Sequence, residues 1–527
     1  MKVAKPIPPF TVASSSFSRR GSPTQAMRKQ HQQSPPPLLC SLKALHTFCC
    51  FLFAISCLAL VPFLYLAYKP CRAQDFLHGS AEVDPSLWSG HLFDDLPFAW
   101  NHLRYSKHHP TRRLTIALFV KRWPRGDRAG GMERHALTLH QALARRGHVT
   151  HVFTPDPGGP PEPAPPNMVY HFSPPNPSGS FNARLAYGQF LRANATTPFD
   201  VVHSESVGLP HPLARNLSNL AASWHGIAYE VVHSEIVQEL VRPPGEQRPV
   251  GQQKSMEQRL FRVVEEVRFF DSYAHHVATS DHVGDILRRI YMIPPERVHV
   301  ILNGVDEEVF KRDVERGLEF RRRHSVPEAA KLVVGLSGRL VKDKGHPLMV
   351  EALRQVFEED AAALEGVYFL VAGDGPWAGR YRELGRNFLV LGPLDRPQLA
   401  GFYNALDVFA NPTLRAQGLD QTVLEAMLTG KPVMVARFAS MTESAVVGPE
   451  MGYVFSPKVE RLKEVLYKVM GDGKAVLEEK GAAARQRALK LFTATKMAAS
   501  YERLFLCISA KHKGEDEGHC RYPLVSD

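Results

Sequence analysis

The sequence predicts an α/β protein with two domains, each built on a mostly parallel sheet, and one apolar segment that precedes them. Short apolar stretches alternate with stretches of helical periodicity from residue 114 to about residue 500. Strands and helices that alternate in this way form parallel sheets with helices on both faces. A turn at residues 303–306 separates two such series, and an uncharged apolar run over residues 48–68 lies before both.

The apolar run over residues 48–68 is about as long as the ~20 residues that cross a bilayer core. Residues 1–74 contain no Asp or Glu, whereas Lys and Arg recur before the run. This asymmetry predicts a signal anchor with a cytoplasmic N-terminal side, so that the body of this single-pass type II membrane protein lies in the Golgi or ER lumen. An organellar transit peptide is the open alternative, because residues 11–34 are Ser-rich, basic and free of acidic residues. A buried core helix is the third interpretation of the run.

The charge distribution, the cysteines and the glycosylation sequons also indicate where the body of the protein lies and which kinds of site it can contain. Much of the net charge of +11 precedes the apolar run, where it indicates membrane orientation rather than nucleic-acid binding. No cysteine lies between Cys71 and Cys507, which argues against a disulfide scaffold or a thiolate metal site in the body. The sequons at Asn194 and Asn216 are compatible with a lumenal body. The expected segments are a basic cytoplasmic tail (1–47), the transmembrane anchor (48–68), a stem (69–110), an N-terminal domain (111–312), a C-terminal domain (313–490), a terminal helix (491–510) and a polar tail (511–527).

The first domain is expected to begin with a β-α-β unit. Residues 114–120 are the first strand, a helix begins at Gly130 and Gly131 and ends at Gly147, and residues 149–153 are the next strand. Further strands of this domain are expected at residues 168–172, 200–203, 221–224, 276–279 and 298–302. In the second domain we expect strands at residues 332–336, 368–372, 388–391, 408–410 and 432–435, then a last helix over about 475–507 and a disordered tail from residue 511.

The loops after the strands of the second domain carry the candidate chemistry. Gly338 and Arg339 follow the strand at 332–336, and Lys344 lies five residues further on. Ligands of open parallel sheets bind beyond the carboxyl ends of the strands, so both cations are expected to face a crevice. A guanidinium and an ammonium group there would stabilise the negative charge of a departing diphosphate without a metal ion. Solvated surface cations are the alternative interpretation.

Two further features of this domain allow a structural and a functional interpretation. Gly373 and Gly375 follow the strand at 368–372, where glycine permits either close approach to a ligand or a sharp turn, and the turn is favoured for this motif alone. Glu425 lies on a helix expected over about 421–429 and ended by Gly430. Its carboxylate could accept hydrogen bonds from ribose hydroxyls, or be an exposed helix residue stabilised by the helix dipole.

Taken together, the motifs resemble retaining glycosyltransferase family 4, whose GT-B fold places two Rossmann-like domains face to face across a cleft. In the second domain the resemblance rests on the segments GRLVKDKG and GDGP and on Glu425 before Ala-Met, with a polar partner, Gln417, eight positions earlier. In the first domain GGMERH looks like the GGxER helix start of that family. Residues 200–203, 225–226 and 303–306 look like its DVVH, HG and NGVD segments. The similarity covers roughly residues 114–500.

The resemblance implies a membrane-anchored enzyme that transfers a sugar from a UDP- or GDP-sugar. Arg339 and Lys344 would bind the donor diphosphate, and Glu425 would bind the ribose. His225 would lie near the reacting sugar. For His203, both a role in the site and a role in the core are possible. Retention in this family is discussed as front-face attack with help from the leaving phosphate, which needs no protein nucleophile. No Asp-x-Asp triplet occurs, so no metal or other cofactor is expected. The acceptor is an unknown glycan, lipid or small molecule.

Two positions depart from the family pattern. Gln417 stands where the family has glutamate, and Asp420 stands where it has glycine. Gln417 keeps hydrogen-bonding capacity without the charge, and Asp420 is suited to be the N-cap of the helix that carries Glu425. A nucleotide-sugar-binding or scaffolding relative without turnover is therefore an alternative function, and a sugar-nucleotide epimerase is a third. The predicted catalytic residues are Arg339, Lys344, His225 and Gln417, and the predicted donor-binding residues are Gly130, Gly131, Gly338, Gly373, Gly375, Gly418, Asp420 and Glu425.

Overall fold

The computed structural model describes residues 84–524, except residues 95, 107–109, 111, 125–129, 157, 159–164, 243–249 and 417. The chain divides into two units, Met1–Glu82 and Val83–Asp527, and only the second contains described residues. The expected cytoplasmic tail (1–47) and transmembrane anchor (48–68) lie outside the described residues. Among the helices of the described part, none has the length and apolar character needed to span a membrane.

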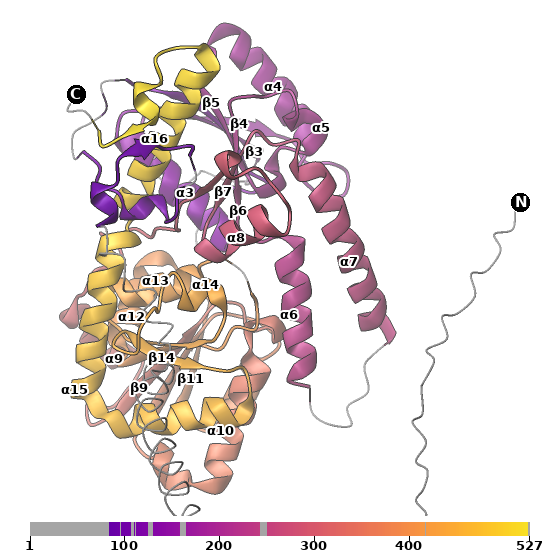
Figure 1. Ribbon diagram of the computed structural model, residues 1–527. Helices are drawn as coiled ribbons and strands as arrows, with labels where there is room; N and C mark the ends of the chain where they lie inside the picture. The colour runs from indigo at the N-terminus through magenta and orange to yellow at the C-terminus, as the bar shows by residue number, and fades with distance from the viewer. Residues whose placement is uncertain are drawn as a thin grey trace, which may run out of the picture. The chain divides into compact units, whose positions relative to one another are not determined.

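The N-terminal domain contains a seven-stranded sheet in which all neighbouring strands are parallel (Figure 1). Its central strands are buried along their whole length, as expected for a sheet covered by helices on both faces. In spatial order the strands are β4 (Met168–Ser173), β3 (Val149–Pro155), β2 (Thr115–Phe119), β5 (Val201–Glu205), β6 (Leu220–Trp224), β7 (His275–Ala278) and β8 (Val298–Val300). Its helices are α3 (Gly131–Arg145), α4 (Ala183–Thr196), α5 (His211–Ala214), α6 (Ala228–Leu240), α7 (Val250–Phe270) and α8 (Asp281–Arg289).

The C-terminal domain repeats this architecture with six parallel strands. In spatial order they are β11 (Phe388–Gly392), β10 (Val367–Ala372), β9 (Leu332–Ser337), β12 (Val408–Asn411), β13 (Val433–Ala436) and β14 (Gly452–Phe455). Its helices are α9 (Val314–Arg323), α10 (His346–Glu359), α11 (Ala378–Glu383), α12 (Arg396–Ala405), α13 (Gln421–Leu428), α14 (Ala439–Thr442) and α15 (Val459–Leu491).

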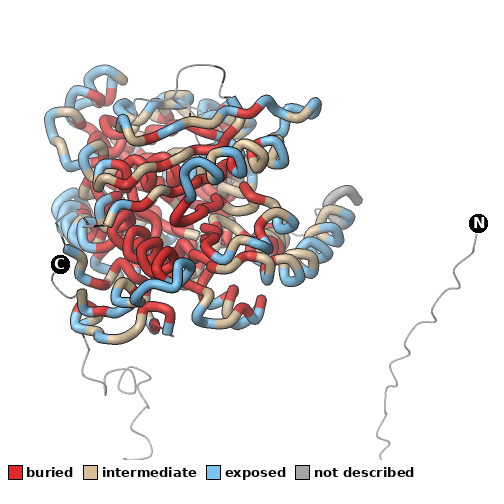
Figure 2. The backbone as a smooth tube through the Cα atoms, turned by 90° about the horizontal axis from the view of Figure 1, so that it is seen from above, coloured by how far each residue is buried: buried red, intermediate tan, exposed pale blue. Residues whose placement is uncertain are grey.

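Both sheets change direction of strand order at a central strand, β2 in the first domain and β9 in the second. Loops that leave the carboxyl ends of strands beside such a switch point diverge and open a crevice. Buried apolar residues from the sheets and their helices form the core of each domain. In Figure 2 the buried segments lie mostly in the interior and the exposed ones at the periphery. The expected α/β fold with two Rossmann-like domains is confirmed.

The end of the chain differs from the expected arrangement. The sequence predicted a last helix over about 475–507, whereas α15 ends at Leu491. A separate helix, α16 (Ala494–Lys513), begins after the N-cap Thr493 and lies where the terminal helix (491–510) was expected. α16 leaves the C-terminal domain and packs on α3 and β5 of the first domain (Figure 1). Its side chains are buried from Met497 to Ala510, because the first domain covers one face and the N-terminal segment of the described chain covers another.

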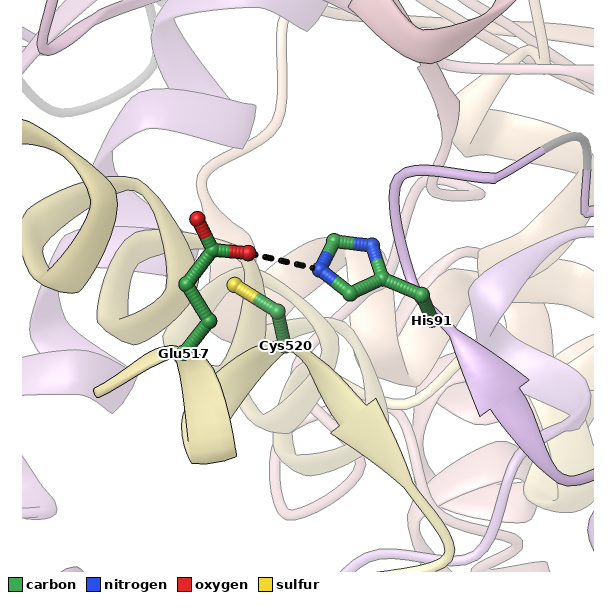
Figure 3. A group of neighbouring side chains, drawn as sticks. All are labelled: His91, Glu517 and Cys520. Carbon is green, nitrogen blue, oxygen red and sulfur yellow. Dashed lines mark hydrogen bonds and ion pairs between the residues drawn. The ribbon is translucent and has the colours of Figure 1, made fainter.

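The expected stem (69–110) and polar tail (511–527) also need correction within their described residues. The chain before β2 contains two 3₁₀ turns and packs Phe93, Trp100 and Leu103 into the apolar cluster beneath α16. A disulfide joins Cys507 of α16 to Cys520. Nearby, His91 Nε2 donates a 3.0 Å hydrogen bond to Glu517 Oε2 (Figure 3). The elements concerned are η1 (Pro85–Leu87), β1 (Gly90–His91), η2 (Trp100–His102), η8 (Glu517–Cys520) and β15 (Arg521–Tyr522), of which β1 and β15 pair antiparallel.

Candidate functional site

A cleft of about 610 Å³ lies where the loops of the two domains meet. The first domain contributes the loop from β2 to α3 and the residues after β6, and the second contributes the loops after β9 and β12. Most of the residues predicted from the sequence line this cleft together, although they come from widely separated parts of the chain. They are Gly130, Gly131, His225, Gly338, Arg339, Lys344, Gly418 and Asp420. Gln417 lies outside the described residues.

Gly373 and Gly375 do not line the cleft but support the loop that does. Gly373 has a φ of +133°, and a Cβ atom there would lie 1.9 Å from the carbonyl oxygen of Gly338. A Cβ atom at Gly375 would lie 2.4 Å from the carbonyl oxygen of Leu340. Only glycine allows the loop after β10 to pack this closely against the backbone on both sides of Arg339. The turn interpretation therefore describes their geometry, and they act on the cleft through Arg339.

The cations of the cleft differ in whether they are already paired. Lys344 Nζ donates a 2.6 Å hydrogen bond to Asp420 Oδ2, and Arg415 Nε lies 3.3 Å from Asp343 Oδ2. Arg339 has no ion pair with any residue that the structure describes. Arg339, like the exposed Arg122 on the wall of the first domain, is therefore a cleft cation without an ion-pair partner among the described residues, and it is the one that directly follows β9. Arg415 was not predicted, although its position two residues before Gln417 was a signal for it.

Asp420 is the N-cap of α13, as its position in the sequence predicted. Its Oδ1 accepts a hydrogen bond from the backbone N–H of Thr422 at 3.2 Å, and its Oδ2 accepts one from Asn411 Nδ2 at 3.2 Å. Burial acts to raise the pKa of the Asp420 carboxyl, but the Lys344 ammonium and these hydrogen bonds hold it well below its usual value. An ionised carboxylate therefore occupies the N-terminus of α13 at the edge of the cleft, a place that also suits a phosphate.

Asp420→Asn is expected to tighten the binding of UDP by about fivefold, because it removes roughly 1 kcal/mol of charge repulsion and releases Lys344. Asparagine caps helices as well as aspartate does, so the fold should be retained. Isothermal titration calorimetry measures the effect. Asp395→Asn, which changes the N-cap of α12 outside the cleft, is the matched control. An unchanged or weaker affinity in Asp420→Asn would mean that Asp420 does not compete with the donor.

Glu425, the predicted ribose ligand, is buried in an ion pair between the two domains. Arg134 Nη1, on α3, donates a 2.6 Å hydrogen bond to Glu425 Oε1, and Tyr403 OH donates one of 2.8 Å to Oε2. Burial raises the pKa of the Glu425 carboxyl, although Arg134 acts in the opposite direction. Arg134 lines the cleft and Glu425 lies behind it. Arg134 stood inside the recognised GGMERH segment, but no signal in the sequence paired it with a residue 291 positions away.

His225 lines the cleft and has a charged residue behind it. Its Nε2 lies 2.5 Å from Glu205 Oε2, and the other oxygen of Glu205 lies 3.0 Å from His135 Nδ1. Glu205 and His135 are fully buried, whereas His225 is partly exposed. Glu205 was missed, although its place at the carboxyl end of β5, two residues after His203, was a usable signal.

His203 belongs to the core of the first domain. Its Nδ1 pairs with His140 Nε2 at 2.8 Å and its Nε2 with Ser223 Oγ at 2.8 Å. Burial lowers the pKa of His203 to about 4, so the ring is neutral at physiological pH. The structure thus places His203 in a hydrogen-bond network below the cleft and not at its surface.

Three groups of described side chains bring potential metal ligands together. Cys520 of one group is in a disulfide, and the other two groups share Glu205 with histidines of the first domain. In the group nearest the cleft, direct hydrogen bonds between His135, Glu205 and His225 account for the close approach of their nitrogen and oxygen atoms. The expectation that the reaction needs no metal remains a prediction.

Comparison with known proteins identifies the class of this chain. The model of Glycosyltransferase Family 4 matches residues 129–309, and that of Glycosyl transferases group 1 matches residues 331–472. Together the two matches cover more than half of the chain and coincide with the two domains that form the cleft. The chain is thus a glycosyltransferase of the GT-B type. Its first domain matches the Family 4 model and its second the group 1 model.

Curated relatives and solved structures agree with this assignment. D-inositol 3-phosphate glycosyltransferase of Xylanimonas cellulosilytica is 28% identical over 339 residues, which are 59% of this chain and 76% of the relative. An enzyme of the same name from Catenulispora acidiphila is 26% identical over 397 residues, or 69% and 88%. Sucrose-phosphate synthase from Thermosynechococcus elongatus has the same fold, with a TM-score of 0.58, 20% identity and coverage of 76% of this chain and 100% of that one. Anabaena HepE in complex with UDP-glucose has a TM-score of 0.53, 16% identity and coverage of 74% and 99%.

Proposed function

We propose that this chain transfers a sugar from a UDP- or GDP-sugar to an acceptor with retention of configuration and without a metal ion. The observation that carries the proposal is the cleft cation Arg339. It follows β9 at the carboxyl edge of the sheet, has no ion-pair partner among the described residues, and shares the cleft with Gly130 and Gly131 of the opposite domain. This arrangement suits a diphosphate, which gains negative charge as the bond to the sugar breaks.

The remaining site residues have supporting roles in this proposal. The backbone N–H groups at the start of α3, beside Gly130 and Gly131, favour an anion because the N-terminus of a helix carries partial positive charge. Lys344 joins Arg339 at the diphosphate once the donor competes with Asp420. Glu425 binds the ribose after its ion pair with Arg134 opens, and Gln417 contacts the sugar by hydrogen bonding alone. The leaving phosphate, with Arg339 bound to it, accepts the proton of the attacking hydroxyl on the same face of the sugar.

The direct test is a panel of UDP- and GDP-sugars incubated with the purified body of the protein. We expect thermal stabilisation by the matching donor and slow release of its sugar to water even when no acceptor is supplied. Absence of transfer, of donor hydrolysis and of stabilisation across the panel would refute the proposal. A free isomerised sugar formed without an acceptor would instead identify an epimerase.

A second function, donor binding without turnover, is favoured by two contacts of the cleft. Asp420 is paired with Lys344 and Arg134 with Glu425, so two of the three side chains assigned to the diphosphate and the ribose are engaged within the protein. A protein that only binds would be stabilised by UDP-sugars and would release no sugar from them. The same panel therefore separates the two functions.

We also propose that the body lies in an oxidising compartment, anchored by residues 48–68. The Cys507–Cys520 disulfide is typical of proteins of the secretory pathway. Asn216 is exposed, whereas Asn194 lies in α4 and its side-chain oxygen accepts a hydrogen bond from the backbone N–H of Phe199 at 2.9 Å. Asn216 is thus the sequon better placed to receive a glycan.

Asn216→Gln is expected to remove the one endoglycosidase-sensitive mass shift of the protein expressed in eukaryotic cells. Asn194→Gln, the matched control, should leave the shift in place because that side chain is held within a helix. Gel mobility before and after endoglycosidase treatment measures the effect. A body that carries no glycan and is digested by protease from the cytosolic side of sealed membranes would overturn the lumenal orientation.

A further inference from the structure

The strongest feature that the proposed function does not use is the buried carboxylate behind His225. Glu205 ends β5 with a fully buried side chain, and its two oxygens contact two different imidazoles. Oε2 lies 2.5 Å from Nε2 of His225, which follows β6, and Oε1 lies 3.0 Å from Nδ1 of His135, which belongs to α3. The rings of His135 and His225 meet edge to face with their centroids 4.4 Å apart. Glu205 thus joins three elements at the wall of the cleft.

The charge of this cluster is concentrated on Glu205. Burial acts to raise the pKa of its carboxyl, but the two imidazoles and their hydrogen bonds hold it well below its usual value. Burial lowers the pKa of His135 despite the nearby carboxylate, so this ring is neutral and donates its Nδ1–H to Glu205. The neighbouring His140 and His203 are also kept neutral by burial and contact each other. Glu205 is therefore the one anion of the cluster.

An ionised carboxylate can only accept hydrogen bonds, and this fixes the proton on His225. Nε2 of His225 must carry the hydrogen that reaches Glu205. Nδ1 of His225 has no hydrogen-bond partner among the described residues, and the side chain is partly exposed at the cleft. A carboxylate that accepts a hydrogen bond from one nitrogen of a histidine thereby fixes which nitrogen keeps a free lone pair and holds the ring in one orientation.

We propose that Glu205 is a positioning residue for the transfer reaction, which holds His225 with its proton on Nε2 and its Nδ1 lone pair available to a hydroxyl group of the bound substrate. This inference rests on the proposed glycosyltransferase function. His225 contacts the substrate and Glu205 acts through His225. His135 supports Glu205 from the other side and so links the start of α3, where Gly130 and Gly131 lie, to the orientation of the His225 ring.

Glu205→Gln is the variant that tests the proposal, because glutamine keeps the size of the side chain, removes its charge and replaces one of the two acceptor oxygens by an NH₂ donor. We expect kcat to fall by about 100-fold, the loss that a misplaced substrate-contacting group can cause, while the KM for the donor and its thermal stabilisation of the protein change less than threefold. The matched control is Glu502→Gln, since Glu502 also accepts hydrogen bonds from a buried histidine, His148, at 2.7 Å, but does not line the cleft. A purely structural role for Glu205 would give both variants the same small loss of kcat, and that result would overturn the proposal.

A measurement on the wild-type protein keeps the proposal testable even if Glu205→Gln fails to fold. Nitrogen-15 NMR of labelled imidazoles, assigned with His225→Gln, is expected to show a protonated Nε2 and an unprotonated Nδ1 for His225 at neutral pH. A protonated Nδ1 would overturn the proposal, and so would a stoichiometric metal ion held by His135, Glu205 and His225 in the purified protein. Failure of the proposed function has a different signature, because the wild type would then turn over no donor whatever the tautomer.

Discussion

Arg339→Ala is expected to lower kcat/KM for the matching donor by about 10²–10³-fold, the usual effect of removing one group that stabilises developing negative charge. Arg339 lines the cleft and has no ion pair among the described residues, so its guanidinium meets the leaving diphosphate without first breaking a contact. Lys344 is held by Asp420 at 2.6 Å and has to exchange that partner for the diphosphate. Lys344→Ala alone should therefore cost less activity than Arg339→Ala, and the double variant should abolish turnover.

Steady-state kinetics on the two single variants and the double variant measure these losses of activity. Circular dichroism and thermal unfolding check that each variant is folded. Arg380→Ala is the matched control, because Arg380 lies in the same domain on α11, is exposed, and pairs with Glu383 away from the cleft. Wild-type activity in Arg339→Ala with Lys344→Ala would refute the assignment of the diphosphate site. A larger loss in Lys344→Ala than in Arg339→Ala would instead show that the Lys344–Asp420 pair is already open in the working enzyme.

The fold was predictable because each domain repeats one pattern within a short stretch of sequence. Apolar strands at 114–120 and 332–336 each precede a polar loop and a helix, and these local signals place the loops on the carboxyl edges of two sheets. Gly130 and Arg339 are positioned by those edges alone. Asp420 was also predictable as an N-cap, since capping depends on the next two or three residues.

What the sequence did not reveal depends on partners distant in the chain. α16 packs on the first domain, and Phe93 and Trp100 pack beneath it. The sequence of each segment shows that it has an apolar face, but not which distant segment covers that face. The contact of Glu425 with Arg134 and that of Glu205 with His225 likewise join separate strands and helices. Motif matching assigned Glu425 to the ribose, but it could not show that an arginine of the opposite domain already occupies that carboxylate.

Glu425→Ala is expected to reduce the free energy of unfolding by about 3–5 kcal/mol, because removing one partner of a buried ion pair leaves the other charge uncompensated. The side chain of Arg134 is 17% exposed and that of Glu425 is 2% exposed, so water replaces little of the lost interaction. Among the described residues Glu425 is the one that forms an ion pair with Arg134, and the buried Nε of Arg134 has no hydrogen-bond partner there. Urea unfolding followed by fluorescence measures the loss.

A double variant separates the energy of this ion pair from its part in donor binding. Arg134→Met with Glu425→Met replaces both charges by apolar groups, which is often neutral for stability, so the unfolding free energy should return most of the way to that of the wild type. Donor binding should not return, since the carboxylate proposed for the ribose is absent. A double variant that is stable and binds UDP as the wild type does would exclude Glu425 from the donor site. Stability that stays as low as in Glu425→Ala would show that the uncompensated charge of Arg134 is not the cause of the loss.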